Sequence, residues 1–206
     1  MEKILKSCDL TLNKSVVLAS ESPRRRELLS QILPTFEVVA SNIDENLINS
    51  FLPSKLVKMR AYAKAHSVKE TNEVGDKTII SADTVVYRNK VYGKPIDFID
   101  AVEMLTALNG KWHTVFTGVC ILSGDTEISF TCRSRVKFKQ LTRREIESYI
   151  DLKKPFDKAG SYGIQDSQIV AEYTGSYTNI VGLPMEKLTA ILIKAGVCDA
   201  HDRTFN

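Results

Sequence analysis

The feature that most constrains the fold is the alternation of β-branched runs with helix-like segments along the first half of the chain. The pattern predicts strands at residues 15–20, 36–40 and 78–87, and helices at residues 23–33 and 53–70. This order is typical of an α/β protein, in which helices connect the strands of a sheet and cover its faces.

The second half of the chain adds antiparallel signals to this pattern. Runs at residues 114–122 and 126–138 flank Ser123-Gly124-Asp125, which predicts a hairpin. Thr142-Arg-Arg-Glu145 is a capping box that starts a helix. Further segments are expected as follows: helix 97–108, a polar loop 153–167, strand 168–173, and a last helix from Pro184. We therefore predict an α/β fold whose mixed, twisted sheet is flanked by helices.

Composition excludes several classes of protein. The 28 basic and 25 acidic residues leave a formal charge of only +3, whereas nucleic-acid binding normally needs a concentrated basic face. No stretch approaches the ~20 apolar residues of a membrane span, and the N-terminus does not resemble a signal peptide. The four cysteines form no CxxC pair and are scattered, so neither a zinc site nor a disulfide framework is expected. These features predict a cytoplasmic protein with no nucleic-acid or membrane partner.

The first candidate site lies where the strand at residues 15–20 gives way to a helix. Ser20 and Ser22 precede Arg24 and Arg25 in the first helical turn. Unpaired amide groups at a helix start attract anions, and arginine pairs with phosphate in a bidentate way. Cations are unfavourable at that end of the helix dipole, which indicates that they have another role. A capped surface helix with solvated arginines explains the same residues equally well.

Asp83 is the second candidate, because it interrupts an apolar strand where an unpaired carboxylate is costly to bury. Such a residue binds a cation, accepts a proton or closes a structural ion pair. Asp44 and Glu45 follow the second expected strand and could add oxygen ligands. Together these carboxylates suit a hard cation such as Mg²⁺.

Three lysines could neutralise a polyphosphate. Lys64 lies in the helix at residues 53–70, where a solvated face is the simpler interpretation. Lys94 precedes a proline after a strand, and Lys158 lies in the loop that leads to Gln165. Trp112 and His113 are expected to be packed or edge residues at the start of a strand.

Five segments, in order along the chain, resemble the successive motifs of the Maf family. They are ASESPRR (19–25), SADTVV (81–86), YGKP (92–95), DKAGSYGIQ (157–165) and NIVGLP (179–184). The resemblance extends from about residue 15 to residue 193, so the chain is expected to form one domain. Residues 1–14 would be an N-terminal extension and residues 198–206 a C-terminal tail.

The resemblance implies a nucleoside triphosphate pyrophosphatase with a fold similar to the inosine triphosphatase group. That fold has two lobes around a central cleft and is often a homodimer. The resemblance also implies that Asp83 is the general base and that Arg24, Thr84 and Gln165 select the base, in the combination of the subgroup acting on dTTP and UTP. Asp83 with Asp44 or Glu45 would hold a divalent ion (Mg²⁺, Mn²⁺ or Co²⁺).

In the same hypothesis the other candidate side chains bind the phosphates of the nucleotide. These are Ser20, Ser22, Arg25, Lys64, Lys94 and Lys158, with Arg24 helping to neutralise charge. Tyr162 could pack beside the base.

One departure from the family pattern keeps other functions open. Asp166 follows Gln165 where the family usually has glycine, and a carboxylate near the base could alter selectivity. A house-cleaning pyrophosphatase for modified or other nucleotides, such as 7-methyl-GTP, is therefore an alternative. A non-catalytic nucleotide-sensing regulator of cell division is another, although such a module has no need of a water-activating base.

Overall fold

The computed structural model describes residues 10–71, 74–166 and 168–200. The strands are β1 Leu10–Leu12, β2 Val16–Leu18, β3 Glu37–Val38, β4 Thr78–Arg88, β5 Lys90–Tyr92, β6 Trp112–Ser123, β7 Thr126–Phe138, β8 Val170–Thr174 and β9 Cys198–Ala200. The α-helices are α1 Pro23–Ser30, α2 Pro53–Glu70, α3 Phe98–Leu108, α4 Arg143–Lys153, α5 Tyr177–Val181 and α6 Met185–Lys194. Short 3-10 helices are η1 Glu45–Leu47, η2 Pro155–Asp157 and η3 Ala159–Ser161.

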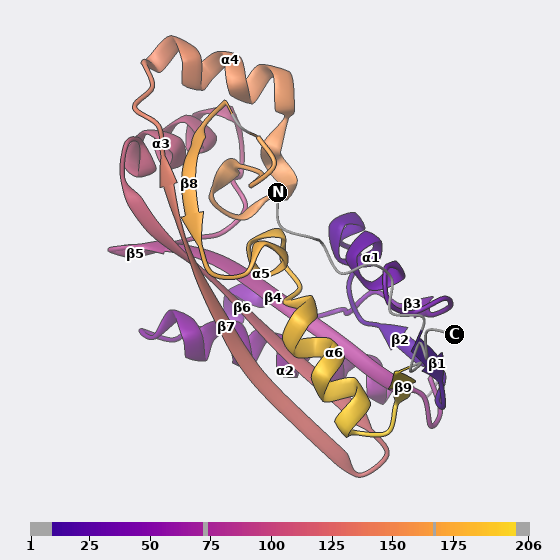
Figure 1. Cartoon of the computed structure of the whole chain (residues 1–206). Helices are drawn as coiled ribbons and strands as arrows, with labels where there is room; N and C mark the ends of the chain where they lie inside the picture. The colour runs from indigo at the N-terminus through magenta and orange to yellow at the C-terminus, as the bar shows by residue number, and fades with distance from the viewer. Residues whose placement is uncertain (1–9, 72–73, 167, 201–206) are drawn as a thin grey trace, which may run out of the picture.

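A seven-stranded mixed sheet forms the centre of the molecule (Figure 1). Its order is β3-β2-β4-β6-β7-β8, and β5 pairs with β4 beside this path. β2 is parallel to both β3 and β4, whereas the pairs from β4 to β8 are antiparallel. The predicted α/β fold with a mixed sheet flanked by helices is therefore confirmed.

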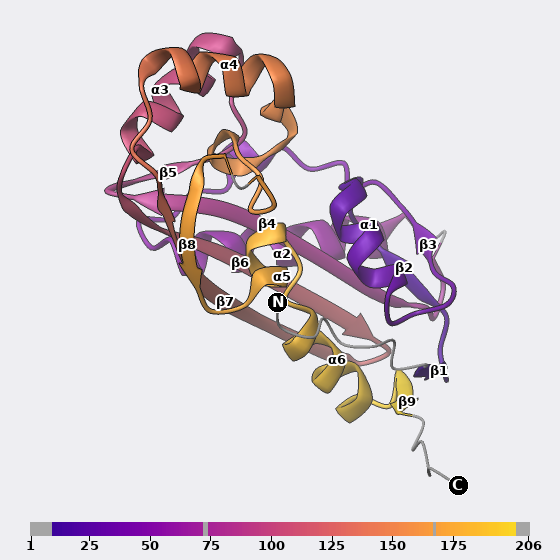
Figure 2. The same ribbon diagram turned by 45° about the horizontal axis from the view of Figure 1, so that its top comes forward.

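The three long strands β4, β6 and β7 run through both lobes of the molecule. At one end α1 and α6 cover one face of the sheet and α2 covers the other. At the other end α3 and α4 lie side by side against the same strands (Figures 1 and 2). The two lobes thus share one continuous hydrogen-bonded sheet.

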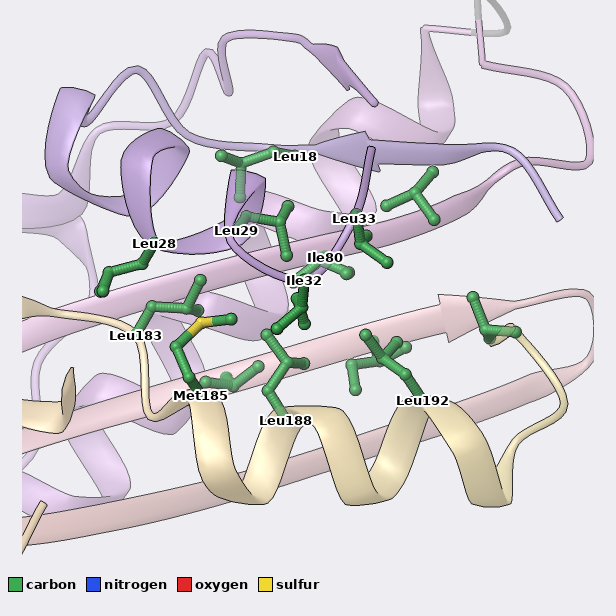
Figure 3. Packing of buried hydrophobic residues seen from close by; sticks show 14 of the residues in the cluster. Leu18, Leu28, Leu29, Ile32, Leu33, Ile80, Leu183, Met185, Leu188 and Leu192 are labelled. Atoms are coloured by element: carbon green, nitrogen blue, oxygen red, sulfur yellow. The ribbon is translucent and has the colours of Figure 1, made fainter. Parts of the chain in front are cut away.

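Strand alternation distributes the core between the two faces of β4. Ile80 and Ala82 pack with α1 and α6, while Ile79 packs with α2. Figure 3 shows Leu29 of α1 and Leu188 of α6 converging on Ile80. Each buried aliphatic side chain of this kind contributes ~1.5–3 kcal/mol. Because successive residues point to opposite faces, the next two positions, 83 and 84, are also directed apart.

Helix α2 approaches the sheet most closely at Gly118 of β6. A Cβ at that position would lie 2.4 Å from the backbone carbonyl atoms of Val57 and 2.6 Å from the backbone nitrogen of Lys58. Neither backbone group can move without moving the helix. Gly118 also pairs with Asp83 across the β4–β6 ladder. Because residue 118 has no side chain, α2 can pack close to the sheet beside Asp83.

Several boundaries differ from those expected. The second strand contains only Glu37–Val38, and the first helix ends at Ser30 rather than near residue 33. The expected loop at 153–167 contains η2 and η3. The capping box at Thr142 is present with both of its hydrogen bonds.

The short elements β1, β5, β9 and α5 were not expected from the sequence. β1 and β9 pair with each other, although they fall in the expected N-terminal extension and C-terminal tail. Within the described ranges, no helix combines the length and the apolar character needed to cross a bilayer. Cys120, Cys132 and Cys198 are free thiols, and Cys8 lies outside the described residues.

His113 belongs to a buried aromatic group under the α3–α4 lobe. Its ring makes edge contacts with Phe138 and Tyr162, and its Nε2 lies 2.8 Å from the Tyr162 hydroxyl oxygen. Burial lowers the pKa of His113 to about 4 from its usual value of 6.5. His113 is therefore a packed residue, as expected.

Replacing Gly118 with alanine should destabilise the protein by about 3 kcal/mol, because the new methyl group must displace the α2 backbone. Urea unfolding followed by circular dichroism measures this loss. Gly93→Ala is the matched control, since a Cβ there meets nothing within 4 Å. Equal stability of the two variants would contradict the close approach of α2.

His113 should make the folded state sensitive to acid. Because its pKa is lower in the folded state, the stabilisation is complete above pH 6.5 and is lost as pH falls towards 4. Between pH 7.5 and pH 5 the wild-type protein should lose about 2 kcal/mol of unfolding free energy through this residue. The His113→Gln variant should lose correspondingly less in urea titrations at the two pH values. Identical pH dependence in both proteins would exclude this effect.

Candidate functional site

A cleft of about 750 Å³ lies between the two lobes, which is large enough for a nucleotide. Its walls come from the start of α1, the loop around η1, the middle of β4 and the segments at 91–94 and 157–165. The sequence-predicted residues that line the cleft are Ser20, Ser22, Arg24, Arg25, Glu45, Lys64, Asp83, Thr84, Lys94, Lys158 and Gln165. Segments far apart in the sequence thus converge on one cavity.

Asp44 is the exception among the predicted residues. Its carboxylate accepts a hydrogen bond of 2.9 Å from the backbone N–H of Asn46 and thereby caps η1. Asp44 is exposed and does not line the cleft, whereas the adjacent Glu45 does. The turn of η1 separates the two neighbouring carboxylates, so the structure gives Asp44 a local structural role.

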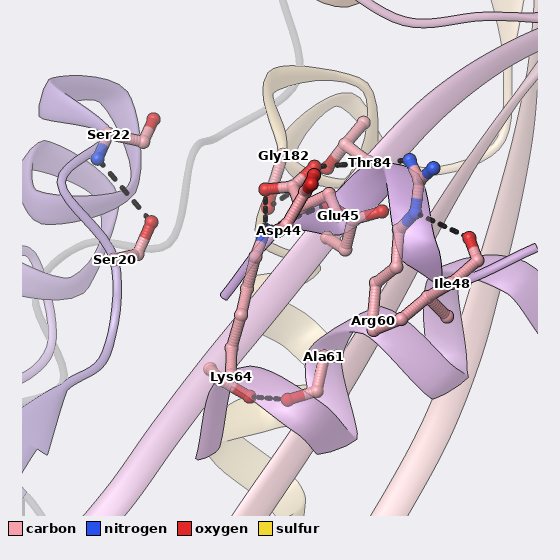
Figure 4. Close-up of polar contacts among 12 residues, drawn as sticks. Ser20, Ser22, Asp44, Glu45, Ile48, Arg60, Ala61, Lys64, Thr84 and Gly182 are labelled. Carbon is pink, nitrogen blue, oxygen red and sulfur yellow. Dashed lines mark hydrogen bonds and ion pairs between the residues drawn. The ribbon is translucent and has the colours of Figure 1, made fainter. Parts of the chain in front are cut away.

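Lys64 joins the two acidic groups of the site. Its ammonium group lies 2.9 Å from Asp83 Oδ1 and 2.6 Å from Glu45 Oε1, and its side chain is only 8% exposed. Figure 4 shows Lys64 reaching from α2 towards the carboxylate of Glu45. Burial raises the pKa of Glu45, but the charges of Lys64, Arg60 and Lys94 outweigh burial and hold it below its usual value. Lys64 is therefore a buried ion-pair partner rather than a solvated surface residue.

Among the described residues, the second oxygen of Asp83 has no hydrogen-bond partner. Asp83 is 4% exposed, and its Oδ2 atom is buried without any hydrogen bond. A buried acceptor that lacks a donor is costly, and such groups concentrate at functional sites. Because Asp83 lines the cleft, this oxygen is a candidate acceptor for a water molecule or a ligand for a cation.

The donor set partly fits a divalent metal. Asp83 Oδ2 is unpaired, and Glu45 Oε2 has only a 3.9 Å contact with Arg60. Carboxylate oxygens are the ligands that Mg²⁺ prefers. Among the described residues, however, no three His, Cys, Asp or Glu side chains cluster as a metal site. Asp83 and Glu45 are thus the pair that could contact an ion, with the remaining ligands supplied by substrate or water.

Arg25 is buried against neutral acceptors. Its Nε donates to the Gly182 carbonyl oxygen at 2.9 Å, and its two terminal nitrogens donate to the hydroxyls of Ser20 and Thr84 at 3.0 Å each. Burial lowers the pKa of Arg25, while the carboxylates of Asp83 and Glu45 oppose that shift. In the part of the chain that the structure describes, no carboxylate forms an ion pair with Arg25. Its charge is thus available to an anion in the cleft.

The hydroxyl of Thr84 belongs to the same network. It accepts from Arg25, lies 3.0 Å from the Thr117 hydroxyl and 3.5 Å from the Gly182 carbonyl oxygen. Gly182 has a φ of 127°, which favours glycine. Thr84 and the Gly182 carbonyl group therefore orient the guanidinium of Arg25 through their hydrogen bonds.

Asp157 links two of the predicted cations. Arg24 forms an ion pair with its carboxylate and a 3.1 Å hydrogen bond with its backbone oxygen. Lys158 Nζ lies 2.7 Å from the same carboxylate. These contacts connect α1 to the segment after α4, so Arg24 and Lys158 face the cleft from different segments.

Asp157 and Arg60 are charged cleft residues that the sequence analysis did not predict. Asp157 stands in the DKAGSYGIQ segment directly before Lys158, and that adjacency was its only signal. Arg60 lies four residues before Lys64 in α2, so helical spacing puts both cations on one face. Arg60 donates to the backbone oxygen of Ile48 and lines the cleft, whereas Lys94 is exposed at its rim.

Gln165 and Asp166 differ in exposure and in the groups that they contact. Gln165 is exposed and lines the cleft. Asp166 is only 9% exposed and accepts a 2.7 Å hydrogen bond from the Tyr149 hydroxyl of α4. The carboxylate of Asp166 thus faces α4, and Asp166 is not among the residues that line the cleft.

Similarity to known proteins agrees with this geometry. The family described as Maf-like protein matches residues 15–195. A dTTP/UTP pyrophosphatase of Thermosipho africanus is 47% identical over 93% of this chain and 98% of its own. A dTTP/UTP pyrophosphatase of Bacillus cereus strain Q1 is 41% identical over 91% of this chain and 99% of its own.

The fold also resembles a solved structure. The Ham1 protein of Staphylococcus aureus superposes with a TM-score of 0.52 at 13% identity, covering 88% of this chain and 100% of the Ham1 chain. At that identity the likeness concerns the fold alone. The family match over residues 15–195, together with the identity to curated relatives, shows that this chain belongs to the Maf family.

Proposed function

We propose that this protein is a nucleotide pyrophosphatase that hydrolyses dTTP and UTP to the nucleoside monophosphate and pyrophosphate. The relatives that are 41–47% identical over most of the chain carry that activity in their names. The observation that supports the chemistry best is the unpaired Oδ2 of Asp83 in a cleft lined with cations.

In this proposal Asp83 acts as the general base. Lys64 holds Oδ1, which leaves Oδ2 to accept a proton from a water molecule in the cleft. The water oxygen bonds to the α-phosphorus, and the bond between that phosphorus and the α–β bridging oxygen breaks. Pyrophosphate leaves with the electrons of that bond.

The basic residues neutralise charge along the triphosphate. Arg25 contributes a buried charge that its neutral hydrogen-bond partners do not compensate. Arg24, Lys94 and Lys158 add positive charge from three separate segments. Electrostatic stabilisation of this kind is a large part of catalysis in phosphoryl transfer. Ser20 and Ser22 lie at the start of α1, where amide groups are available to phosphate oxygens.

A nucleotide pyrophosphatase of this family implies a divalent metal ion. Asp83 and Glu45 are the side chains proposed to hold it, and Mg²⁺, Mn²⁺ and Co²⁺ are the candidate ions. When bound, such an ion supplies positive charge at the reacting phosphate and lowers the pKa of water.

Base selection is assigned to Gln165 at the cleft wall. Its amide can donate and accept together and so match the O4 and N3 edge of a pyrimidine. Arg24 and Thr84 remain proposed specificity residues, with Thr84 acting through its contact with Arg25. The alternative substrate class, which includes 7-methyl-GTP, was suggested by a carboxylate at Asp166 near the base. That carboxylate instead accepts a hydrogen bond from Tyr149 of α4. A non-catalytic sensor of nucleotide has no use for an unpaired, buried carboxylate.

Two further expectations belong to this proposal. The scattered cysteines favour a reducing compartment, and we expect the protein to act in the cytoplasm. We also expect it to form a homodimer, which remains a prediction.

The substrate assignment is tested with a panel of triphosphates in the presence of Mg²⁺, Mn²⁺ or Co²⁺. dTTP and UTP should give monophosphate and pyrophosphate at least about tenfold faster, by kcat/KM, than ATP, GTP or 7-methyl-GTP. Chromatography of the nucleotides and separate assays for pyrophosphate and orthophosphate measure the products. Orthophosphate as the first product would contradict cleavage at the α–β bond.

Replacement of Asp83 by asparagine should lower kcat for dTTP by at least about a hundredfold, because the amide cannot accept the proton of water. Asp44→Asn is the matched control, since it removes a carboxylate that caps η1 outside the cleft. That control should retain kcat within about threefold of wild type. Near-normal turnover by the folded Asp83→Asn protein would remove Asp83 from the role of base.

A further inference from the structure

The segment at 163–166 is a tight turn whose side chains differ in exposure. The N–H of Asp166 donates to the carbonyl oxygen of Gly163 at 3.1 Å, which closes the turn. Ile164 is buried in the core of the α3–α4 lobe, while Gln165 is exposed at the cleft. The direction of Gln165 therefore depends on how firmly this turn is held.

The hydroxyl of Tyr149 holds both ends of the turn. It donates to Asp166 Oδ2 at 2.7 Å and accepts a 3.3 Å hydrogen bond from the N–H of Gly163. Tyr149 belongs to α4 and is only 3% exposed. Because α4 packs against α3, this hydroxyl attaches the turn to a rigid part of the lobe.

The Asp166 carboxylate and the Gln165 amide also share one small space. A Cβ at Gly163 would lie 2.9 Å from Asp166 Oδ2 and 2.9 Å from Gln165 Nε2. Both side chains therefore lie close to the Cα atom of Gly163. A shift of the Asp166 carboxylate releases space into which the Gln165 amide can move.

Lys153 contributes little to this arrangement. Its ammonium group lies 3.5 Å from Asp166 Oδ1, and its side chain is 40% exposed. At this distance, with the lysine partly in water, the ion pair is weaker than the 2.7 Å hydrogen bond from Tyr149. The hydrogen bond with Tyr149 is thus the contact that orients Asp166.

We propose that Asp166 is a positioning residue, which acts through Tyr149 to direct Gln165 into the cleft and so sets base selectivity. This inference rests on the proposed function for its kinetic consequences. Asp166 itself does not contact the substrate, since its carboxylate faces α4.

Steady-state kinetics test this role with Asp166→Ala and Tyr149→Phe. Each should raise KM for dTTP about tenfold and leave kcat within about twofold, because the reacting groups are undisturbed. The preference for dTTP over GTP in kcat/KM should fall by a similar factor. Asp166→Asn keeps an acceptor oxygen for Tyr149, so it should stay within about threefold of wild type.

A double variant and a stability control distinguish a positioning role of Asp166 from a general loss of stability. In the Gln165→Ala protein, Asp166→Ala should cause no further change in base preference, since its effect passes through Gln165. Leu192→Ala, in the core under α6, is the control with a lowered Tm and an unchanged KM. A full tenfold further loss in the Gln165→Ala background, or an unchanged KM in Asp166→Ala, would overturn the proposal.

A spectroscopic measurement keeps the test independent of activity. The side-chain amide NMR signals of Gln165, assigned by their loss in Gln165→Ala, should shift in Asp166→Ala and Tyr149→Phe, and less in Asp166→Asn, where only the neighbouring charge changes. Unshifted signals in the first two variants would refute positioning. A wild-type protein that releases no pyrophosphate from dTTP or UTP would instead refute the proposed function, and the NMR result would still decide the role of Asp166.

Discussion

The contact between α2 and the sheet at Gly118 determines how the site is assembled. Val57 lies against Gly118, and Lys64 follows seven residues later, two turns further along the same face of the helix. Because Gly118 pairs with Asp83 across the ladder, α2 comes closest beside the carboxylate that Lys64 must reach. A larger residue at 118 would lift the helix and lengthen that ion pair. The geometry of the ion pair between Lys64 and Asp83 thus depends on residue 118 being a glycine.

The polar groups of the cleft are arranged as two networks on opposite faces of β4. Asp83 faces α2 and is held by Lys64, while the adjacent Thr84 faces α1 and contacts Arg25. Buried charges are costly unless they are compensated, and each network leaves one charged group only partly satisfied. The unpaired oxygen of Asp83 and the uncompensated guanidinium of Arg25 have opposite charges. A polyphosphate with its cation and water complements both.

The sequence predicted the alternation of elements and most of the cleft, because strand periodicity and motif order are local signals. Asp83 was found from the cost of placing a carboxylate in an apolar run. Asp44 could not be distinguished from Glu45, since only the turn of η1 decides which one faces the cleft. The β1–β9 pair joins strands almost two hundred residues apart and is too short to leave a periodic pattern. The direction of Asp166 depended on Tyr149, a contact that spacing does not reveal.

The continuous strands beneath the cleft also bear on how substrate enters and leaves. β4, β6 and β7 carry unbroken ladders from one lobe to the other, so the two lobes share the same paired strands. Closure by rotation of one lobe would have to bend a twisted sheet across its hydrogen bonds. Access is therefore governed by the loop that contains η1 and by the segment after α4, both of which form the rim. Movement of these two rim segments, rather than of a whole lobe, would then open the cleft.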